Sequence, residues 1–320
     1  MQSQSEFLSL RDHLQKIIIG QHKLLDRLMI SMLTGGHVLL EGVPGLAKTT
    51  AVNALAKGLH ASFQRIQFTP DLMPGDVTGV DVYDPETRGF RFIEGPIFHE
   101  IILADEINRA PPKVQSALLE AMAEHQVTVS GVTRPLPELF VVLATQNPLE
   151  QSGTYPLPEA QLDRFLLHVQ LTYPSPDEEL LILQQDRKQH FGEDKNTPHT
   201  LLKPETVINA RREVAEIHVE EMLERYIITL ITATRNLAEW NKDWSDYLIA
   251  GASPRASIAL LRAASAMAYL KGRNFVMPED IVELAPDVLR HRLVLSYAGH
   301  ANETTPDNII QHLLSSIPIP

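Results

Sequence analysis

The sequence predicts an α/β fold in which a five-stranded parallel sheet lies between layers of helices, followed by an all-α domain. Short apolar runs alternate with helical patterns as far as residue 175, which is typical of a parallel sheet covered by helices. A glycine-rich turn joins the first apolar run to a helical pattern. Beyond residue 175 only helical patterns follow.

The composition is that of an ordinary globular protein with an acidic charge balance. The 320 residues are 44% hydrophobic and 21% charged, and 28 basic against 40 acidic side chains give a formal net charge of −12. This balance argues against nucleic acid as a partner, because little cationic surplus is left to displace phosphate counterions. There are no cysteines, which excludes disulfides, thiolate metal sites and a cysteine nucleophile.

The sequence also shows no signal for export or membrane insertion. The N-terminal residues lack the basic and apolar regions of a signal peptide. No apolar run approaches the ~20 residues that a membrane-spanning helix needs. We therefore expect a cytoplasmic protein that does not insert into a membrane.

The elements of the first domain follow one another in chain order. Helical spacing covers residues 6–16 and 21–34 and is broken at Gly20. A further helical pattern with one apolar stripe covers residues 113–124. Because the most apolar runs have no polar face, we expect strands that are buried on both sides. The five predicted strands are residues 37–41, 63–68, 101–105, 140–145 and 166–171.

Two segments interrupt the alternation of strands and helices. Residues 70–95 are rich in glycine, proline and aspartate and form an insertion. Residues 126–138 place the pair Ser130-Gly131 between runs of valine and threonine. That pattern predicts a β-hairpin.

The helical patterns after residue 175 predict a second domain, so the expected domains are residues 1–175 and 176–320. Ser253-Pro254 and Met277-Pro278 favour helix starts, since proline is tolerated in the first turn. A polar connector covers residues 192–203. The predicted helices are residues 177–191, 204–217, 219–238, 254–272, 278–292 and, more weakly, 306–315.

A phosphate-binding turn is predicted at residues 42–49, Gly-Val-Pro-Gly-Leu-Ala-Lys-Thr. The turn follows a strand and opens a helix, so its backbone N–H groups and the helix dipole can face phosphate oxygens. Lys48 can reach the outer phosphates and Thr49 can bind Mg²⁺. Ala47 stands where the general pattern has glycine. An alanine fits this position only if its φ is negative. For this motif alone, an ordinary glycine–proline turn before a helix is the alternative. The residues expected to hold the nucleotide are Gly42, Pro44, Gly45, Leu46, Ala47, Lys48, Thr49 and Thr50.

Polar residues follow the third and fourth predicted strands. Asp105 ends the third strand, where it could hold Mg²⁺ through the water shell of the ion, and Glu106 comes next as a candidate general base. Asn147 follows the fourth strand, where its amide could orient the attacking water. The alternatives are two acidic residues that merely end a strand, and an Asn-Pro turn.

Two arginines are candidates for contacts to phosphate. Arg164 precedes the fifth strand and could be an arginine finger that reaches the nucleotide of a neighbouring subunit. Arg255 lies in the first turn of a helix, where the dipole favours anions, so a cation there suggests a nearby anion. An exposed surface arginine is the alternative for both positions.

These elements together resemble the AAA+ ATPases, and most closely their MoxR branch. The resemblance is carried by GVPGLAKT, ILADEINRAPPKVQSALLEAMAE, ATQNPLEQSGTYPLPEAQLDRF and GASPRAS, and it covers nearly the whole chain. Ala47 departs from the general phosphate-loop pattern but fits this branch.

The resemblance implies a role for each motif residue. Lys48 and Thr49 correspond to Walker A, and Asp105 and Glu106 to Walker B. The other correspondences are Asn147 with sensor 1, Arg164 with the arginine finger, Arg255 with sensor 2, and Ile18, Ile19, Gly20 and Gln21 with the segment that packs on adenine. Residues 70–95 and 126–138 correspond to a helix-2 insertion and a pre-sensor-1 insertion, which face a partner or a central pore.

The resemblance further implies Mg²⁺-dependent hydrolysis of ATP to ADP and phosphate, with Arg255 contacting the nucleotide of its own subunit. The expected assembly is a homo-oligomeric ring, expected to be hexameric. The ring would remodel or activate a client protein, in some cases one with a von Willebrand A-type domain.

Three other functions are compatible with parts of this pattern. A nucleotide-gated assembly scaffold would bind ATP with little turnover, although Glu106 and Arg164 argue against it. A chelatase-type motor subunit shares much of the architecture. A DNA motor is disfavoured by the net charge of −12.

Overall fold

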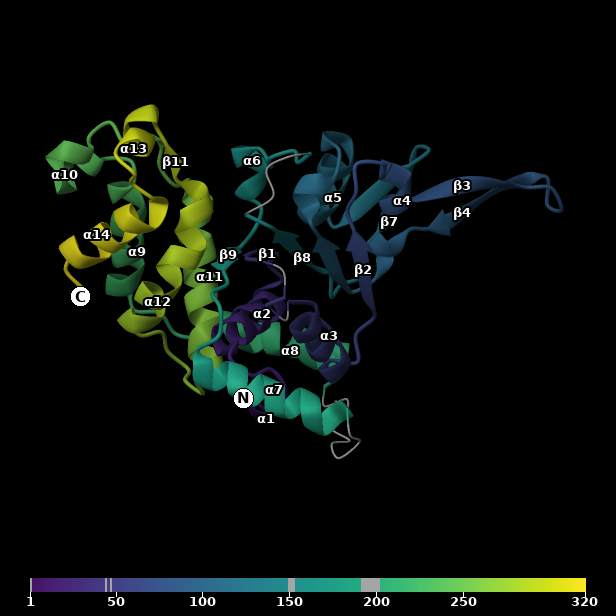
Figure 1. Ribbon diagram of the computed structural model, residues 1–320, viewed down its shortest axis with the longest axis horizontal. Helices are drawn as coiled ribbons and strands as arrows, with labels where there is room; N and C mark the ends of the chain where they lie inside the picture. The colour runs from purple at the N-terminus through teal and green to yellow at the C-terminus, as the bar shows by residue number, and fades with distance from the viewer. Residues whose placement is uncertain (1, 44, 47, 149–152, 191–201) are drawn as a thin grey trace.

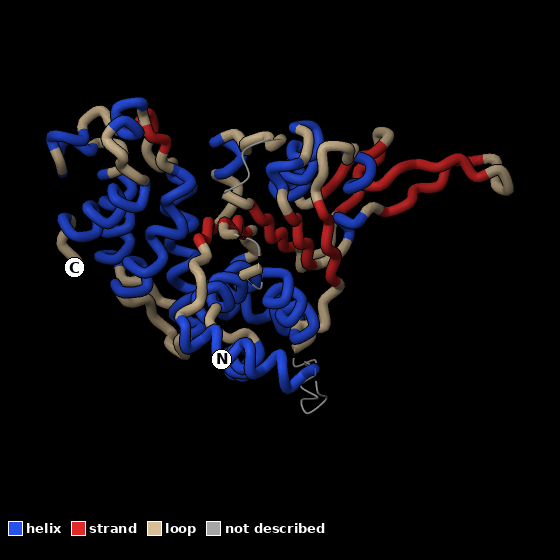
Figure 2. The backbone as a smooth tube through the Cα atoms, in the orientation of Figure 1, coloured by secondary structure: helices blue, strands red, loops and turns tan. Residues whose placement is uncertain are grey.

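A computed structural model describes residues 2–43, 45–46, 48–148, 153–190 and 202–320. A five-stranded parallel sheet forms its centre, in the order β2-β5-β8-β1-β9 (Figures 1 and 2). The predicted fold and all five predicted strands are confirmed. The strands are β1 (Val38–Glu41), β2 (Phe63–Gln67), β5 (Ile101–Asp105), β8 (Val141–Gln146) and β9 (Leu167–Gln170).

The sheet is covered on both faces, which explains its apolar strands. On β5, Ile101 and Leu103 belong to one hydrophobic cluster, whereas Ile102 and Ala104 belong to another. The first cluster includes residues of α1 (Gln2–Ile17), α2 (His22–Thr34) and α3 (Lys48–Gly58), and the second includes residues of α5 (Pro112–Glu124). Successive side chains of a strand point to opposite faces, so each central strand contributes to both clusters.

Both insertions form β-hairpins. The predicted hairpin consists of β6 (Gln126–Val129) and β7 (Val132–Pro135), and Ser130 and Gly131 have φ values of 50° and 80°. Such positive angles are those of a two-residue hairpin turn. The other insertion contains α4 (Pro74–Thr78) and a hairpin of β3 (Gly79–Asp84) and β4 (Gly89–Glu94), which projects away from the sheet (Figure 1). The sequence predicted this segment only as an insertion, without strands.

The chain after residue 175 is mainly helical in its described residues. A short antiparallel ribbon pairs β10 (Leu248–Ala250) with β11 (Val294–Leu295). The prediction of helices alone was wrong here, because such short segments show no period-2 pattern. None of the described helices has the length and apolar character needed to cross a membrane. The main helices are α7 (Pro176–His190), α8 (Pro204–Ala215), α9 (Glu221–Ala233), α10 (Leu237–Trp240), α11 (Pro254–Leu270), α12 (Pro278–Leu289), α13 (Tyr297–Ala301) and α14 (Pro306–Ser316).

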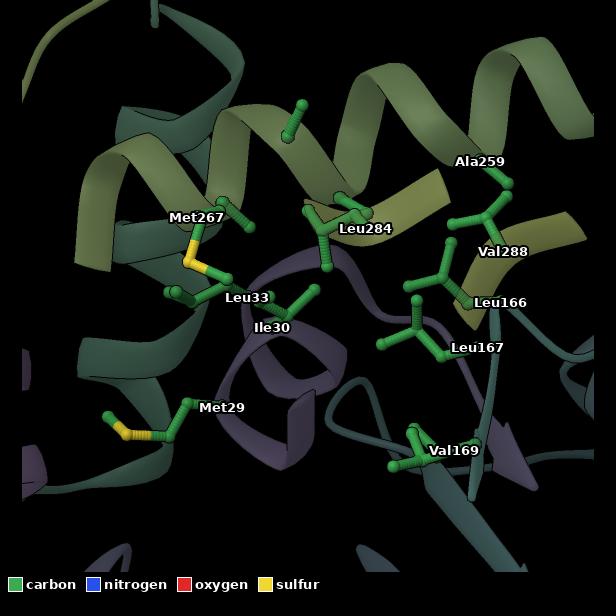
Figure 3. Packing of buried hydrophobic residues seen from close by; sticks show 14 of the residues in the cluster. Met29, Ile30, Leu33, Leu166, Leu167, Val169, Ala259, Met267, Leu284 and Val288 are labelled. Atoms are coloured by element: carbon green, nitrogen blue, oxygen red, sulfur yellow. The ribbon is translucent and has the colours of Figure 1, made fainter. Parts of the chain in front are cut away.

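The helical half shares its core with the sheet. Helix α11 packs against α2 and α12, and α12 also packs against β9. Figure 3 shows Ile30 and Leu33 of α2 beside Met267 of α11 and Leu284 of α12. Helix α8 packs against α1 and α2. The domain boundary at residue 175 stays a prediction, since apolar contacts cross it.

A buried ion pair also joins α2 to α12. The Arg27 side chain is 1% exposed, and its Nε donates to Asp287 at 2.8 Å while its Nη1 donates to Glu283 at 2.9 Å. Because a buried charge needs a partner, this pair fixes which faces of the two helices meet.

His37 is a buried polar residue at the start of the sheet. Its Nδ1 accepts a hydrogen bond from the Val142 N–H at 3.0 Å, so Nε2 carries the proton and donates to the Met122 carbonyl at 3.2 Å. Burial lowers the pKa of His37 to about 4. The neutral ring therefore links β8 and α5, and protonation would destabilise this contact.

We predict that protonation of His37 reduces stability in acid. The unfolded chain, with a histidine pKa near 6.5, binds the proton more readily than the folded chain. The free energy of unfolding should therefore fall by about 3 kcal/mol between pH 6.5 and pH 4 through this residue alone. His37→Gln, whose amide can still accept and donate, should flatten the pH dependence measured by urea unfolding.

The exposed His300 on α13 provides the control. His300→Gln should leave the pH profile of the wild type unchanged. An equally steep profile in His37→Gln would show that protonation of this ring does not contribute.

Candidate nucleotide-binding site

The carboxyl ends of three neighbouring strands meet at one cavity. In the sheet, Leu40 of β1 pairs with Thr145 of β8, and Ala104 of β5 pairs with Ala144 of β8. The residues that follow these strands therefore come together, as expected for an open parallel sheet. The cavity has a volume of about 390 Å³ and is lined by Gly45, Leu46, Lys48, Thr49, Thr50, Arg65, Asp105, Glu106, Thr145, Gln146 and Asn147.

Two described residues of the turn before α3, Gly42 and Gly45, lie at positions that favour glycine. Gly45 has a φ of 89°, and a Cβ at this position would have no atom within 4 Å, so its backbone faces open space. At Gly42 a Cβ would lie 3.0 Å from the Leu171 Cβ, which makes glycine the best fit there. Helix α3 begins at Lys48, so its N-terminal N–H groups are directed toward the same cavity. This donor set fits a chain of phosphates. Pro44 and Ala47 lie outside the described residues.

Lys48 places its ammonium group at the base of the cavity. Its Nζ donates to the Gly42 carbonyl at 2.7 Å. Burial lowers the pKa of Lys48, and the nearby carboxylates of Asp105 and Glu106 oppose this shift. A cation that is partly removed from water in this way attracts an anionic ligand strongly.

Asp105 is held by residues from both neighbouring strands. The Thr145 hydroxyl donates to Asp105 Oδ1 at 2.6 Å, and Arg65 of β2 donates to Oδ2 through Nε at 3.0 Å and Nη2 at 2.6 Å. A cation bound by Asp105 and Thr49 would complete its ligand set with phosphate oxygens and water.

Glu106 adopts a left-handed backbone conformation, with φ of 58° and ψ of 50°. This conformation costs about 1–3 kcal/mol in a non-glycine residue and is typical of functional sites. The Glu106 N–H donates to the Thr145 hydroxyl at 2.9 Å. Gln67 Nε2 donates to Glu106 Oε2 at 2.7 Å, and Arg109 Nε lies 3.1 Å from the same oxygen. The carboxylate is thereby oriented at the edge of the cavity.

Three residues of this arrangement were missed in the sequence analysis. Thr145, which is 1% exposed, links Asp105 to the Glu106 backbone. Arg65 and Gln67 lie two positions apart on β2, so they share one face of that edge strand. Polar residues at alternate positions were the available signal, but their target depends on which strand lies beside β2.

The segment expected to contact adenine is not among the described residues that line this cavity. Ile18 is 3% and Gln21 is 7% exposed, and Gln21 Nε2 donates to the Thr172 carbonyl at 3.4 Å. A Cβ on Gly20 would lie 3.2 Å from the Pro174 Cβ. Gly20 and Gln21 therefore lie against the link between β9 and α7, whereas Ile18 belongs to the hydrophobic core. No contact of Ile19 with this link is established.

Arg164 and Arg255 lie together in a second cavity, of about 330 Å³. Arg164 Nη1 donates to the Leu119 carbonyl at 2.5 Å, and Arg255 Nη1 lies 3.7 Å from Asp163 Oδ2. The structure does not bring Arg255 to the lining of the Lys48 cavity. The anion suggested by a cation in the first turn of α11 is supplied within the chain, by Asp163.

Comparisons with known proteins identify relatives of this chain. The family model for the ATPase family associated with various cellular activities (AAA) matches residues 37–167, and the model for the AAA lid domain matches residues 245–313. The chain is 43% identical to Chaperone MoxR1 of Mycobacterium tuberculosis, over 96% of this chain and 80% of that protein. It is 31% identical to Protein MoxR of Paracoccus denitrificans, over 96% of this chain and 94% of that protein.

A crystal structure from Cytophaga hutchinsonii has the same fold. It superimposes with a TM-score of 0.91 at 45% sequence identity, covering 99% of this chain and 96% of the other. The similarity therefore extends over the sheet and over the helices that follow it.

We predict that Lys48 is required for binding of a nucleoside triphosphate. Lys48→Ala should weaken binding of a fluorescent ATP analogue by about tenfold to a hundredfold, because a charge-assisted hydrogen bond contributes about 1.5–3 kcal/mol. Titration of the analogue against the purified chain would measure this change.

Lys57 lies exposed in the last turn of the same helix and serves as the control. Lys57→Ala should bind the analogue as the wild type does. Wild-type affinity in Lys48→Ala would mean that the turn does not hold phosphate.

Proposed function

The chain belongs to the MoxR family of AAA+ ATPases, and from this premise we propose that it hydrolyses ATP with Mg²⁺ to remodel or activate a partner protein. The observation that carries the proposal is the single cavity in which Lys48, Asp105, Glu106 and Asn147 meet a phosphate cradle. This edge of the parallel sheet brings together an ammonium group, two carboxylates and an amide. These are the groups that phosphoryl transfer to water uses.

Each residue has a distinct task in the proposed reaction. Lys48 and the N–H groups of the turn bind the β- and γ-phosphates. Thr49 and Asp105 would hold Mg²⁺, which would supply positive charge to the phosphates. Glu106 accepts a proton from a water that attacks the γ-phosphorus, while Asn147 orients that water. A bond forms between the water oxygen and the γ-phosphorus, and the bond to the bridging oxygen breaks to leave ADP.

Arg164 and Arg255 act on a neighbouring subunit in this proposal. Both line the second cavity, whereas the described lining of the Lys48 cavity comes from residues 45–147 of the chain. A ring, hexameric in its simplest form, would bring the arginines of one subunit to the γ-phosphate of the next. The resemblance implies that Arg255 contacts the nucleotide of its own subunit, whereas in this proposal it acts between subunits, as Arg164 does.

A client protein is the proposed target of the ring. One relative is named as a chaperone, and the family resemblance suggests clients with a von Willebrand A-type domain. The projecting β3–β4 hairpin offers a surface for such a partner, with Tyr83 and Phe90 at 53% and 76% exposure and their ring centroids 5.7 Å apart. We place this activity in the cytoplasm.

The first test separates ATP binding from turnover. Glu106→Gln should reduce steady-state phosphate release by about a hundredfold or more, because it removes the general base. Affinity for the fluorescent ATP analogue should stay within about twofold of the wild type, since the phosphates are bound by other groups.

The matched control is Glu120→Gln on the exposed face of α5, which should turn over at the wild-type rate. Undiminished phosphate release in Glu106→Gln would remove this residue from the base role. A wild-type chain that binds ATP but releases no phosphate would favour the scaffold function.

The second test asks whether Arg164 acts between subunits. Arg164→Ala should lower turnover by about 10³-fold, as expected for an arginine finger. Mixing it with Lys48→Ala should restore part of the phosphate release, because an intact phosphate site then meets an intact arginine.

A chain carrying both substitutions is the control for mixing, because it has no arginine finger to donate. It should restore nothing when mixed with Arg164→Ala. If the single variants also fail to complement each other at any ratio, the arginine does not act across a subunit interface.

A further inference from the structure

Asp163 lies at the centre of a cluster that joins three parts of the chain. Its Oδ1 accepts from Arg292 Nε at 2.8 Å, and its Oδ2 accepts from the Ser253 hydroxyl at 3.2 Å. Arg255 Nη1 lies 3.7 Å from the same Oδ2. One carboxylate therefore connects the residue before Arg164, the first turn of α11 and a buried arginine that follows α12.

The buried arginine belongs to a short basic segment that grips the chain around Arg164. This segment is η4 (Arg290–Arg292). Arg292 donates to the Phe165 carbonyl at 2.7 Å and to the Leu166 carbonyl at 3.3 Å, and His291 Nε2 is 3.0 Å from the Phe165 carbonyl. Arg290 donates to the His168 carbonyl. The main chain leading into β9 is thus fixed to the helical half.

The charge of Asp163 compensates two cations that would otherwise be unfavourable. The Arg292 side chain is 3% exposed; burial lowers its pKa, and the Asp163 carboxylate opposes this shift. Arg255 lies in the first turn of a 17-residue helix, where the dipole disfavours a cation. Asp163 offsets the first effect with a charge-assisted hydrogen bond to Arg292. It opposes the second through an ion pair at 3.7 Å with the Arg255 side chain, which is 69% exposed.

The Ser253 hydroxyl makes the connection to α11 specific. Its oxygen accepts from the Arg255 N–H at 3.2 Å, so Ser253 is the N-cap of the helix that carries Arg255. The same hydroxyl donates to Asp163. A shift of α11 relative to the start of β9 would break both the ion pair and this hydrogen bond.

We propose that Asp163 is a positioning residue that fixes the spacing of Arg164 and Arg255, so that both arginines reach the neighbouring subunit as a preset pair. This inference rests on the proposed function, because it assumes that the pair acts between subunits. Asp163 makes no contact with the nucleotide in this scheme. It acts by holding the pair before the neighbour arrives, so that less ordering is needed in the transition state.

Asp163→Asn tests this inference, because the amide oxygen can still accept from Arg292 while the charge that faces Arg255 is lost. Phosphate release should fall by about tenfold or more. The Kd of the isolated chain for the fluorescent ATP analogue should change by less than about twofold. Mixing with Lys48→Ala should restore release, since that chain supplies an intact arginine pair.

Two controls separate this inference from the proposed function. Asp177→Asn removes an exposed carboxylate of α7 and should be fully active. The mixture of Arg164→Ala with Lys48→Ala reports on action between subunits without involving Asp163. If that mixture recovers but Asp163→Asn with Lys48→Ala does not, Asp163 acts within its own subunit and the inference is wrong. If neither mixture recovers, the proposed action between subunits fails, and the inference fails with it.

Ser253→Ala tests the same connection if Asp163→Asn does not fold. It keeps the ion pair with Arg292 and removes only the hydroxyl between Asp163 and α11. Turnover should fall by about threefold to tenfold, with the same recovery on mixing. Wild-type turnover in a folded Asp163→Asn or Ser253→Ala chain would overturn the inference.

Discussion

The parallel register of β5, β8 and β1 is the constraint on which the rest of the site depends. Because these three strands are adjacent and end together, Asp105, Thr145 and the turn after β1 reach one edge of the sheet. Thr145 joins β8 to the end of β5 by hydrogen bonds, since its hydroxyl donates to Asp105 and accepts from the Glu106 N–H. A slip of one residue in β8 would turn this hydroxyl to the opposite face and break both of these hydrogen bonds.

Strand β9 extends the same constraint to the helical half of the chain. It pairs with β1 in parallel register, so Glu41, the residue before the predicted phosphate-binding turn, lies opposite Gln170. Glu41 also contacts His168, whose Nε2 lies 2.9 Å from Glu41 Oε2. The other end of β9 is held by the basic segment Arg290–Arg292. Strand β9 therefore connects β1, which precedes the predicted phosphate-binding turn, with the helical half of the chain that contains Arg255.

Much of this arrangement could be predicted from sequence, because it depends on local patterns. Buried parallel strands appear as apolar runs, and the residues that follow them gather at one edge whatever the strand order. The contacts of Arg65 and Gln67 could not be predicted, since they depend on β2 lying beside β5. The position of Arg255 could not be predicted either, because it is set by the packing of α11 on α2 and by a contact between residues 90 positions apart.

The two cavities are separate, and polar contacts as well as apolar packing connect the chain segments that line them. Apolar contacts are non-directional and tolerate small shifts of one helix along another, whereas a hydrogen bond weakens steeply when its geometry changes. The contacts from Arg290–Arg292 to the carbonyls of residues 163–168 are directional and mostly buried. On the proposed function, these contacts would couple the positions of Arg164 and Arg255 to β9. Because β9 pairs with β1, the two arginines would also be coupled to the strand that precedes the predicted phosphate-binding turn of the same subunit. On the same proposal, this path would let one nucleotide site influence the next without a helix of the second domain entering its own cavity.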